Sequence, residues 1–385
     1  MSHKPLVVIV ADWFDPAFRA GGPVRSVVNL IDNMHEEYDF KIICGSVDYG
    51  ETSELKEIHT EVWTDWQSKA EVYYMSSRKQ RRKHIFRLLD ECDPDILYVQ
   101  GIFSKTFSIL PLIWWKQAKR GRLVVAPRGM LYASALQIKK LKKRLFLFVT
   151  KTMGWYNHVV WHSTNKQETN EIKSELGFKA EIIEAMNFPV WRKWPEHEPD
   201  FSSDSLKLLC VSRISDEKNP VLLINALSKL NIPIELSIAG DYSNEDYFKK
   251  FMDKVNALPN HIRVHYLGSV PQEEISDLYK KNQLFVLPTK GENFGHAIAD
   301  ALIHGLPCVI GENTPWTDSV NGKAGWCLPM QEEAFANAIL LFHGMSAQEK
   351  QKMSDAAQYV AVNKLDAEKI KPGYRKLFKI ETEDE

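Results

Sequence analysis

Residues 284–300 read Leu284-Phe285-Val286-Leu287-Pro288-Thr289-Lys290-Gly291-Glu292-Asn293-Phe294-Gly295-His296-Ala297-Ile298-Ala299-Asp300. The first five residues predict a buried strand, and apolar residues then recur at helical spacing until Gly305 and Pro307 end the helix. Glu292 is therefore expected in the loop at the carboxyl end of the strand, and Asp300 about a turn and a half into the helix. With a rise of about 1.5 Å per residue, the two carboxylates can stand roughly 10 Å apart. This spacing suits a ligand with hydroxyl groups at both ends.

The backbone between these carboxylates favours an anion. We expect Phe294, Gly295 and His296 to form the first turn of the helix, where unpaired N–H groups and the helix dipole attract negative charge. A diphosphate fits this gap, and a sugar nucleotide has hexose hydroxyls, two phosphates and ribose hydroxyls in the required order. The alternative is that Glu292 is an ordinary loop residue and Asp300 a solvated helix position, because isolated surface carboxylates are common. His296 could equally have a capping or packing role.

The two acids, separated by seven residues, resemble a motif of the retaining glycosyltransferases of family four, which have the GT-B fold. The family carries Glu in the second place, so Asp300 is a departure and must reach about one methylene further than Glu would. The resemblance continues through the helix and the Gly-x-Pro of residues 301–309. It implies that Glu292 is a catalytic residue that holds sugar hydroxyls and that Asp300 holds the ribose. The implied donor-binding residues between them are Asn293, Phe294, Gly295 and His296.

A second motif supplies positive charge. In Leu208-Leu209-Cys210-Val211-Ser212-Arg213-Ile214-Ser215-Asp216-Glu217-Lys218-Asn219-Pro220, a short strand ends at Ser212 and a helix begins near Pro220. Arg213 and Lys218 lie five residues apart in the connecting loop and can converge on one anion. The family resemblance implies that both are catalytic and contact the donor diphosphate, where they stabilise the charge that builds on the leaving phosphate. Taken separately, each is more often only a solvated surface cation.

A third motif is the pair Gly21-Gly22, which follows the predicted strand from Leu6 to Ala11 and precedes a helix from about Val24. Paired glycines let the backbone approach a bulky ligand closely. The pair resembles the glycine loop of the family, which implies a donor-binding role for both residues. It does not fit the dinucleotide fingerprint, since neither Gly-x-Gly-x-x-Gly nor a suitably spaced acid is present. Outside this context, Gly-Gly is usually a turn.

The pattern of elements predicts an α/β fold with two Rossmann-like, doubly wound domains that face each other across a cleft. The chain's 385 residues are enough for two such domains. Strands are predicted at residues 5–11, 39–45, 71–75, 95–100, 122–126, 158–162, 181–185, 206–211, 233–239, 263–267, 283–288, 307–310 and 325–328.

The domain boundaries follow from a break in this pattern. We expect an N-terminal acceptor-binding domain over residues 1–188 and a nucleotide-sugar-binding domain over residues 207–365. Prolines and polar residues mark a linker over residues 189–206. The resemblance to GT-B proteins implies that the helix in residues 366–385 crosses back to the first domain, followed by an acidic tail at residues 381–385.

Composition is that of a soluble globular protein, with 44% hydrophobic and 26% charged residues. The five cysteines are scattered, mostly in or beside apolar runs, and suggest reduced core residues rather than a disulfide framework or metal site. The sequence shows neither a signal peptide nor an apolar run of membrane length, so we expect a cytoplasmic protein.

Positive charge is concentrated in one region despite a net charge of −1. Residues 78–151 contain eighteen Lys or Arg and four Asp or Glu, a local excess of fourteen. The densest groups, residues 78–83 and 139–144, lie on either side of a tryptophan pair in the sequence. This pattern suits an anionic membrane surface or a pyrophosphate-linked lipid acceptor. Ordinary solvated helix faces are the alternative, and nucleic-acid binding is less attractive because no recognition motif accompanies the charge.

Two segments in the basic region, Ala126-Pro127-Arg128-Gly129-Met130-Leu131 and Tyr98-Val99-Gln100-Gly101-Ile102-Phe103, resemble a branch of the family that acts on bacterial surface polysaccharides. Many members have His near Arg128, in contact with the transferred sugar. Arg128 could therefore meet an acidic sugar, a phosphate of the acceptor, or only a helix end.

The triplet Asp93-Pro94-Asp95 matches the metal-binding Asp-x-Asp of the other large glycosyltransferase fold. It lies at the start of a strand, away from the usual ligand crevice, and indicates a turn. We expect no metal, because Arg213, Lys218 and a helix terminus handle the phosphates.

The sequence thus predicts a retaining, metal-independent glycosyltransferase without a cofactor. It would move a hexose from a UDP- or GDP-linked sugar to a glycan or lipid-linked acceptor, in bacterial surface polysaccharide or lipopolysaccharide synthesis, on the cytoplasmic side and peripherally on the plasma membrane. Front-face attack is favoured over a covalent intermediate, because phosphate can accept the proton of the acceptor. A sugar-nucleotide epimerase of similar architecture and a non-catalytic sugar-nucleotide-binding subunit are the alternatives.

Overall fold

Alternating strands and helices build two α/β units. The computed structural model describes residues 4–137, 140–177, 180–190, 200–201 and 203–379. The described residues up to Phe188 form the first unit together with the C-terminal segment from Ala367, and the residues between Pro189 and Asp366 form the second. No helix among the described residues has the length and apolarity needed to span a bilayer.

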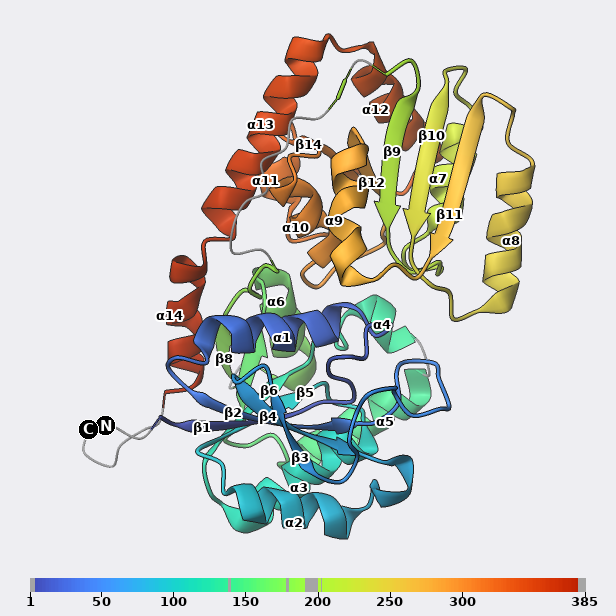
Figure 1. Cartoon of the computed structure of the whole chain (residues 1–385). Coiled ribbons are helices and arrows are strands. Elements are labelled where there is room, and N and C mark those ends of the chain that lie inside the picture. The colour runs from blue at the N-terminus through green and yellow to red at the C-terminus, as the bar shows by residue number, and fades with distance from the viewer. Residues whose placement is uncertain (1–3, 138–139, 178–179, 191–199, 202, 380–385) are drawn as a thin grey trace. The chain divides into compact units, whose positions relative to one another are not determined.

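The first unit contains an eight-stranded sheet in the order β3-β4-β2-β1-β5-β6-β7-β8 (Figure 1). All neighbouring strands are parallel except β3, which pairs with β4 in the antiparallel sense. The strands are β1 (Leu6–Val10), β2 (Asp39–Gly45), β3 (Trp63–Trp66), β4 (Ala70–Met75), β5 (Ile96–Gln100), β6 (Arg122–Ala126), β7 (Val160–Ser163) and β8 (Glu181–Glu184).

Helices cover both faces of this sheet. They are α1 (Gly22–Met34), the 3₁₀ turn η1 (Ser77–Lys79), α2 (Arg82–Cys92), the π-helical turn η2 (Lys105–Ile109), α3 (Leu110–Ala118), α4 (Ala133–Gln137), α5 (Lys140–Thr152), α6 (Lys166–Leu176) and α14 (Ala367–Leu377). Figure 1 shows α1 on one side of the sheet and α2 and α3 on the other. Two apolar clusters fill the spaces between helices and sheet.

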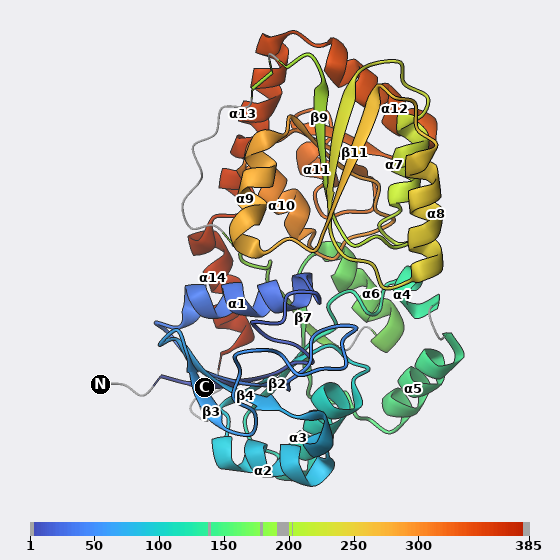
Figure 2. The same cartoon turned by 45° about the vertical axis from the view of Figure 1, so that its right-hand side comes forward.

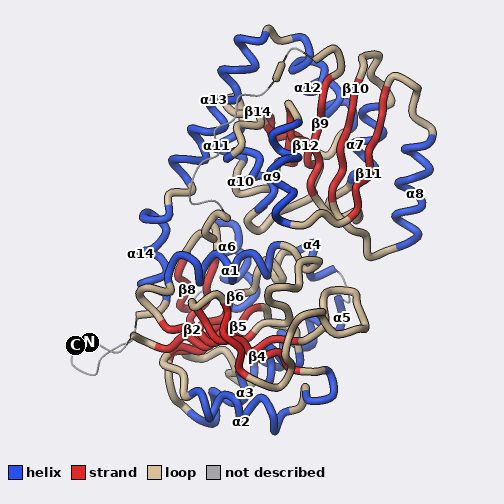
Figure 3. Tube along the Cα trace, in the orientation of Figure 1, coloured by secondary structure: helices blue, strands red, loops and turns tan. Residues whose placement is uncertain are grey.

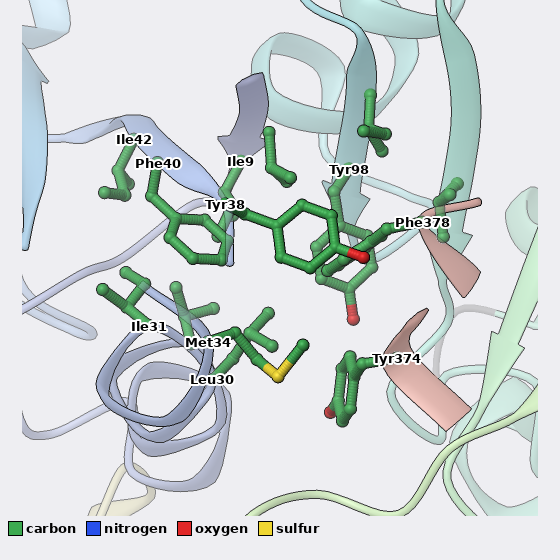
Figure 4. Close-up of a cluster of buried hydrophobic side chains, with 14 of the residues drawn as sticks. Ile9, Leu30, Ile31, Met34, Tyr38, Phe40, Ile42, Tyr98, Tyr374 and Phe378 are labelled. Atoms are coloured by element: carbon green, nitrogen blue, oxygen red, sulfur yellow. The ribbon is translucent and has the colours of Figure 1, made fainter. Parts of the chain in front are cut away.

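The alternation of side chains along β1 decides which cluster each residue joins. Val7 and Ile9 face the cluster under α1 and α14, whereas Val8 and Val10 face the cluster under α2 and α3. Figure 4 shows the first cluster, in which α1, the central strands and α14 bring their apolar side chains together. Burial on both faces explains why the strand is apolar at successive positions.

The C-terminal helix α14 belongs to the first unit by its contacts. It packs on α1 and β8, and Figures 1 and 2 show it next to one end of α1, at a steep angle to that helix. Tyr374 is stacked on Phe188, with 5.0 Å between ring centroids, and Phe378 meets Tyr38 edge to face. Arg375 forms an ion pair with Glu37 in which Nε lies 2.7 Å from Oε2. Burial of several aromatic rings therefore holds this segment on the first sheet.

The second unit contains a parallel six-stranded sheet in the order β11-β10-β9-β12-β13-β14. Its strands are β9 (Leu206–Val211), β10 (Ile234–Ala239), β11 (Ile262–Gly268), β12 (Leu284–Leu287), β13 (Cys308–Gly311) and β14 (Gly325–Leu328). Its helices are α7 (Pro220–Leu227), α8 (Glu245–Asn256), α9 (Gln272–Lys281), α10 (His296–Ile303), α11 (Thr317–Val320), α12 (Glu332–Gly344) and α13 (Ala347–Lys364). Figure 2 shows α9 and α10 on one side of this sheet and α7 and α8 on the other, and Figure 3 separates the strands from these helices by colour.

The α/β fold with two parallel-sheet domains is confirmed. Each predicted strand has a counterpart within one or two residues of its expected ends, and β3 is the strand that the sequence prediction missed. The predicted linker, residues 189–206, lies mostly outside the described residues, and β9 already begins at Leu206. The acidic tail at residues 381–385 also lies outside them.

Candidate active site

The site is built where two neighbouring parallel strands end. β9 and β12 pair in parallel, with Leu284 opposite Leu208, so their carboxyl ends meet at one edge of the sheet. Lys218 lies in the loop after β9, and Glu292 in the loop after β12. Lys218 Nζ donates a hydrogen bond to Glu292 Oε1 at 2.7 Å, and the two side chains are 15% and 12% exposed. The structure thus brings together two of the three predicted catalytic residues, and the alternative of a solvated Lys218 is wrong.

Two further bonds fasten these loops to each other. The backbone N–H of Lys290 donates to the carbonyl of Glu217 at 2.9 Å. Its side-chain Nζ donates to Asp216 Oδ2 at 2.6 Å, in a pair whose side chains are far more exposed than those of Lys218 and Glu292. The loop after β12 is therefore held against the loop after β9 through Lys290 as well as through the Lys218–Glu292 pair.

A third loop, after β13, positions the backbone around Glu292. Glu292 N–H donates to the Asn313 carbonyl at 3.1 Å. The indole N–H of buried Trp316 donates to the Phe294 carbonyl at 2.6 Å, and the two rings meet edge to face. Three successive strand ends thus contribute to a single loop cluster, which holds the Glu292 backbone in addition to the contact of its side chain with Lys218.

The helix α10 begins one or two residues later than the sequence predicted. Its first residue is His296, and Gly295 is the N-cap with a φ of 76°. The expectation that Phe294 and Gly295 lie in the first turn is wrong, because Gly295 has a left-handed backbone conformation that a helix interior does not allow. The first-turn N–H groups, which lack acceptors within a helix, therefore begin at His296. His296 packs against the Phe294 ring, with 4.6 Å between ring centroids.

Asp300 lies in the second turn of α10 and is 1% exposed. The alternative of a solvated helix position is therefore wrong. The Asp300 carbonyl accepts hydrogen bonds from His304, from the backbone N–H at 3.0 Å and from Nδ1 at 2.7 Å. Burial lowers the pKa of His304, the C-cap residue of α10, which favours the neutral form of its ring. The role of Asp300 as a ribose contact stays a prediction.

Arg213 follows β9 on a backbone that is fixed on both sides. Ser212 N–H donates to Ala239 O at 2.9 Å, and Ile214 N–H donates to Asp241 O at 2.8 Å. Gly240 makes this approach of the strand ends possible, because a Cβ there would lie 1.9 Å from the Ser212 carbonyl oxygen. The backbone thus sets where the Arg213 side chain starts, and its contact with a diphosphate stays a prediction.

In the first unit, Gly21 is the N-cap of α1 with a φ of 67°, and α1 starts at Gly22 rather than at Val24. A Cβ on Gly21 would meet no atom within 4 Å. The loop before it is held by Asp48, whose Oδ2 accepts from the backbone N–H groups of Phe18 and Arg19 at 3.0 and 3.1 Å. The glycine turn thus has open space beside it, and the donor-binding role of Gly21 and Gly22 stays a prediction.

Arg128, after β6, is part of a hydrogen-bond network rather than an open cation. Its guanidinium donates from Nε to Gln100 Oε1 at 2.7 Å, from Nη1 to Asn187 Oδ1 at 2.6 Å and from Nη2 to the Tyr98 hydroxyl at 3.0 Å. Its φ of 55° is unusual for a residue other than glycine. Beside it, the carboxylate of buried Glu168 accepts from Gly129 N–H at 2.7 Å. These contacts favour a structural role, and contact with sugar or acceptor stays a prediction.

The network continues through a neutral histidine. The Tyr98 hydroxyl lies 2.5 Å from His162 Nδ1, and His162 Nε2 lies 2.7 Å from the Ala185 carbonyl. Every group is satisfied when Arg128 donates to Tyr98, Tyr98 donates to Nδ1, and Nε2–H donates to the carbonyl. Burial, with the nearby Arg128 charge, lowers the pKa of His162 to about 3. The chain of hydrogen bonds from Arg128 to Ala185, the residue after β8, therefore requires an uncharged His162 imidazole.

The acids of the Asp93-Pro94-Asp95 triplet have structural partners. Asp95 Oδ2 accepts from the Leu6 backbone N–H at 2.7 Å, and Asp93 Oδ1 lies 2.8 Å from Arg120 Nη1. Asp93 ends α2 in a left-handed conformation, as expected for turn chemistry. In the part of the chain that the structure describes, three or more His, Cys, Asp or Glu side chains nowhere gather in a way that could hold a metal ion.

Comparison with known proteins finds a family match within the second unit. Residues 194–359 match the family described as glycosyl transferases group 1. The whole chain is 20% identical over 370 residues to a Klebsiella pneumoniae protein named "Uncharacterized 41.2 kDa protein in cps region", a match that covers 93% of this chain and 96% of the relative. Mannosylfructose-phosphate synthase of Agrobacterium fabrum is 26% identical over 118 residues, 29% of this chain and 26% of the relative.

Solved structures extend the likeness to nearly the whole chain. Anabaena HepE, solved in complex with UDP-glucose, gives a TM-score of 0.74 at 16% identity and covers 97% of this chain and 99% of HepE. Sucrose-phosphate synthase from Thermosynechococcus elongatus gives a TM-score of 0.76 at 14% identity, over 98% of this chain and 99% of the synthase. The chain has the GT-B fold of these neighbours.

Sequence reasoning missed two residues that shape the site. Trp316 and Asn313 follow β13, the parallel neighbour of β12, so the rule that strand ends converge could have indicated their loop. The first unit has a further residue that sequence reasoning left without a role, Asp12 after β1. Its Oδ1 accepts from the Ser104 hydroxyl at 2.7 Å, and burial raises the pKa of the Asp12 carboxyl. No local signal pairs Lys218 with Glu292 across 74 residues.

Proposed function

We propose that this protein is a retaining glycosyltransferase of family four that moves a hexose from a UDP- or GDP-linked sugar to a glycan or lipid-linked acceptor. The proposal rests chiefly on one observation: Lys218 and Glu292 form an ion pair at the carboxyl ends of β9 and β12, beside the N-terminus of α10. The group 1 match over residues 194–359 supports glycosyl transfer. The cps-region name of the Klebsiella relative supports a role in surface polysaccharide, including lipopolysaccharide, synthesis.

The diphosphate of the donor is bound by positive charge from three sources. Arg213 and Lys218 both lie in the loop after β9, and the first-turn N–H groups of α10 add the positive end of a helix dipole. When the phosphates enter, Lys218 exchanges part of its bond to Glu292 for bonds to phosphate oxygens. The fixed cations then stabilise the leaving group more as its charge grows, which accelerates the reaction. We therefore propose that no metal is needed.

The two carboxylates bind the ends of the donor. Glu292, released in part from Lys218, accepts hydrogen bonds from hydroxyls of the sugar. Asp300, in the second turn of α10, accepts from the ribose, and the backbone of Asn293, Phe294, Gly295 and His296 lines the stretch between them. Because Trp316 and Asn313 hold this loop from the neighbouring strand end, the donor groups are positioned before the sugar nucleotide arrives.

The chemical step is a front-face substitution. The acceptor hydroxyl attacks the anomeric carbon on the side from which the nucleoside diphosphate leaves. The bond from that carbon to the phosphate oxygen breaks, the bond to the acceptor oxygen forms, and the hydroxyl proton passes to the departing phosphate. This route needs no base from the protein and retains the anomeric configuration. A covalent sugar trapped on Glu292 would overturn it in favour of two successive displacements.

The experiment begins with thermal unfolding in the presence of uridine, guanosine, adenosine, cytidine and thymidine diphosphates. A nucleotide at one hundred times its dissociation constant adds about 2.7 kcal/mol to the free energy of unfolding. Sugar conjugates of the stabilising nucleotide are then incubated with glycan and lipid-linked acceptors, with and without EDTA, and the product is analysed by NMR. We expect transfer with retained configuration in both conditions. An epimerised donor formed without acceptor, or an inverted product, would contradict the proposal.

We also propose that the protein works at the cytoplasmic face of the membrane, where a lipid-linked acceptor would be found. The basic region of residues 78–151 supports this location, since anionic lipids attract clustered Lys and Arg.

A further inference from the structure

The helix α5 carries a row of apolar side chains that the fold leaves uncovered. Leu141, Leu145 and Phe148 are 86%, 64% and 65% exposed. Their spacing of four and then three residues places them along one face of a helix. Val149 and Met153 extend the exposed apolar surface at the end of α5. Isolated exposed apolar residues are common, but a continuous row of large ones on one helix indicates a binding surface.

This row is not the result of poor packing, because the opposite face of α5 is well anchored. Leu147 is buried in the core of the first unit. Phe146 meets Phe103 edge to face with 5.7 Å between ring centroids. Lys143 turns inward, where its Nζ donates to the Ala135 carbonyl at 2.7 Å and lies 5.0 Å from the Phe103 ring centroid. The helix thus has a fixed orientation that presents the apolar row outward.

Positive charge borders the row on both sides. At 100° per residue, Lys140, Arg144 and Lys151 fall along one edge of the row, and Lys142 falls along the other. All four are exposed. The helix contains no Asp or Glu between residues 140 and 152. An apolar strip between basic edges is typical of a helix that lies in the plane of a bilayer surface.

We propose that α5 is the membrane-docking surface of this protein, with Leu141, Leu145 and Phe148 inserted among the acyl chains of an anionic bilayer and the flanking cations at the headgroups. The basic edges determine this choice of partner, because an apolar protein surface would not require them. The inference rests on the membrane location in the proposed function and names the element responsible for it. Donor binding by the second unit does not depend on it.

The test uses the full chain and sedimentation with phosphatidylcholine vesicles, with or without phosphatidylglycerol. The unmodified protein is expected to sediment with the anionic vesicles and to be released by salt. The triple variant L141Q/L145Q/F148Q is expected to lose binding at every salt concentration. The triple variant K140Q/K142Q/K151Q is expected to bind the anionic vesicles about a hundredfold more weakly, at about fivefold for each cation.

Matched controls come from the second unit. L340Q/L341Q/Y359Q removes three exposed apolar side chains from α12 and α13, and K249Q/K250Q/K254Q removes three exposed cations from α8. Both controls should bind vesicles like the unmodified protein. Equal partition to neutral and anionic vesicles, or α5 variants that bind normally, would overturn the proposal. Loss of a dimer in sedimentation velocity on changing α5, without any vesicle binding, would also overturn it and indicate a second copy as the partner.

Nucleotide binding separates this inference from the proposed function. Stabilisation by the nucleoside diphosphate identified in the thermal screen is measured on the same variants. We expect it to be unchanged in all of them, because the changed residues lie outside the donor site. Vesicle binding without nucleotide binding would leave the docking surface intact and contradict the donor site. Nucleotide binding without vesicle binding would leave the donor site intact and contradict the docking surface.

Discussion

Lys218 and Arg128 are cations in equivalent places, each in a loop at the carboxyl end of a parallel strand, one in each unit. Their partners differ. Arg128 donates to three uncharged acceptors that the fold holds in place, and its network continues to a buried histidine. Lys218 donates to a carboxylate on a neighbouring loop, Glu292. When a sugar nucleotide binds, the Glu292 carboxylate can turn to its hydroxyls and the Lys218 ammonium to its phosphates. The three neutral acceptors around Arg128 are held in place by the fold and cannot move with a ligand. The position of a cation at a strand end therefore identifies a binding residue only together with its partners.

The largest effect is expected from Lys218→Met. Loss of a preorganised cation at the leaving phosphate should lower kcat/KM by about 10²–10³-fold, or about 3–4 kcal/mol of barrier. Transfer is measured with the donor from the nucleotide screen, and urea unfolding checks that the variant is folded. Lys290→Met is the matched control, because Lys290 pairs with the exposed Asp216 in the same loops. Equal losses in the two variants would remove the distinction.

Arg128→Met should act on stability instead. It leaves Gln100, Asn187 and Tyr98 without their shared donor, and unpaired buried polar groups are costly, so we expect the free energy of unfolding to fall by about 3 kcal/mol. Urea titration measures this loss. At a temperature where the variant is folded, kcat/KM should fall less than about tenfold. A large rise in KM with unchanged stability would show instead that Arg128 contacts the sugar or acceptor.

The network at Arg128 also predicts a dependence of stability on acid. His162 has a pKa of about 3 in the folded protein and an ordinary pKa of 6.5 when unfolded. The stability that its neutral form contributes is thus fully present above pH 6.5 and is lost as the pH falls towards 3. Between pH 7 and pH 5 this loss amounts to about 2 kcal/mol, at about 1.4 kcal/mol per pH unit. Urea unfolding of the protein and of His162→Asn at both pH values tests it, since the variant should lack this part of the slope. Parallel pH profiles would contradict the assignment.

The smallest effect is expected from Gly295→Ala. A φ of 76° costs a non-glycine residue about 1 kcal/mol, and the added Cβ would lie 3.1 Å from Ile298 Cδ1 and 3.3 Å from Trp316 Nε1. We expect a loss of about 1–2 kcal/mol of stability and weaker nucleotide binding, because the start of α10 shifts. Gly322→Ala is the control: its φ is 72°, but a Cβ there meets nothing within 4 Å. If Gly295→Ala weakened nucleotide binding no more than Gly322→Ala, the packing around α10 would not position the donor.

Much of the fold could be predicted because parallel strands buried on both faces are apolar at successive positions, as in β1 and β12. The strand β3 escaped prediction for a local reason. It contains only Trp63-Thr64-Asp65-Trp66, and the turn to β4 places Gln67 and Ser68 at φ values of 54° and 55°. Such turns are usually marked by Gly or Asn, and neither is present, so the hairpin has no sequence signal.

The site was predictable in its backbone but not in its pairings. The positions of Glu292 and Lys218 at strand ends follow from strand and helix signals near each residue. Their ion pair depends on β9 and β12 being neighbours in the sheet. The order of the strands along the sequence does not reveal which strands are neighbours. The burial of Asp300 and the Trp316 contact likewise depend on packing between segments distant in sequence. A choice between the alternatives for Arg128 required its three hydrogen-bond partners, which come together only in the folded first unit.

The most direct test of the account is a crystal structure with the sugar nucleotide that the thermal screen identifies. We predict the diphosphate within hydrogen-bond distance of Lys218 and Arg213 at the start of α10, with Glu292 turned from Lys218 to the sugar hydroxyls. A donor bound elsewhere, with the Lys218–Glu292 bond unchanged at 2.7 Å, would contradict it.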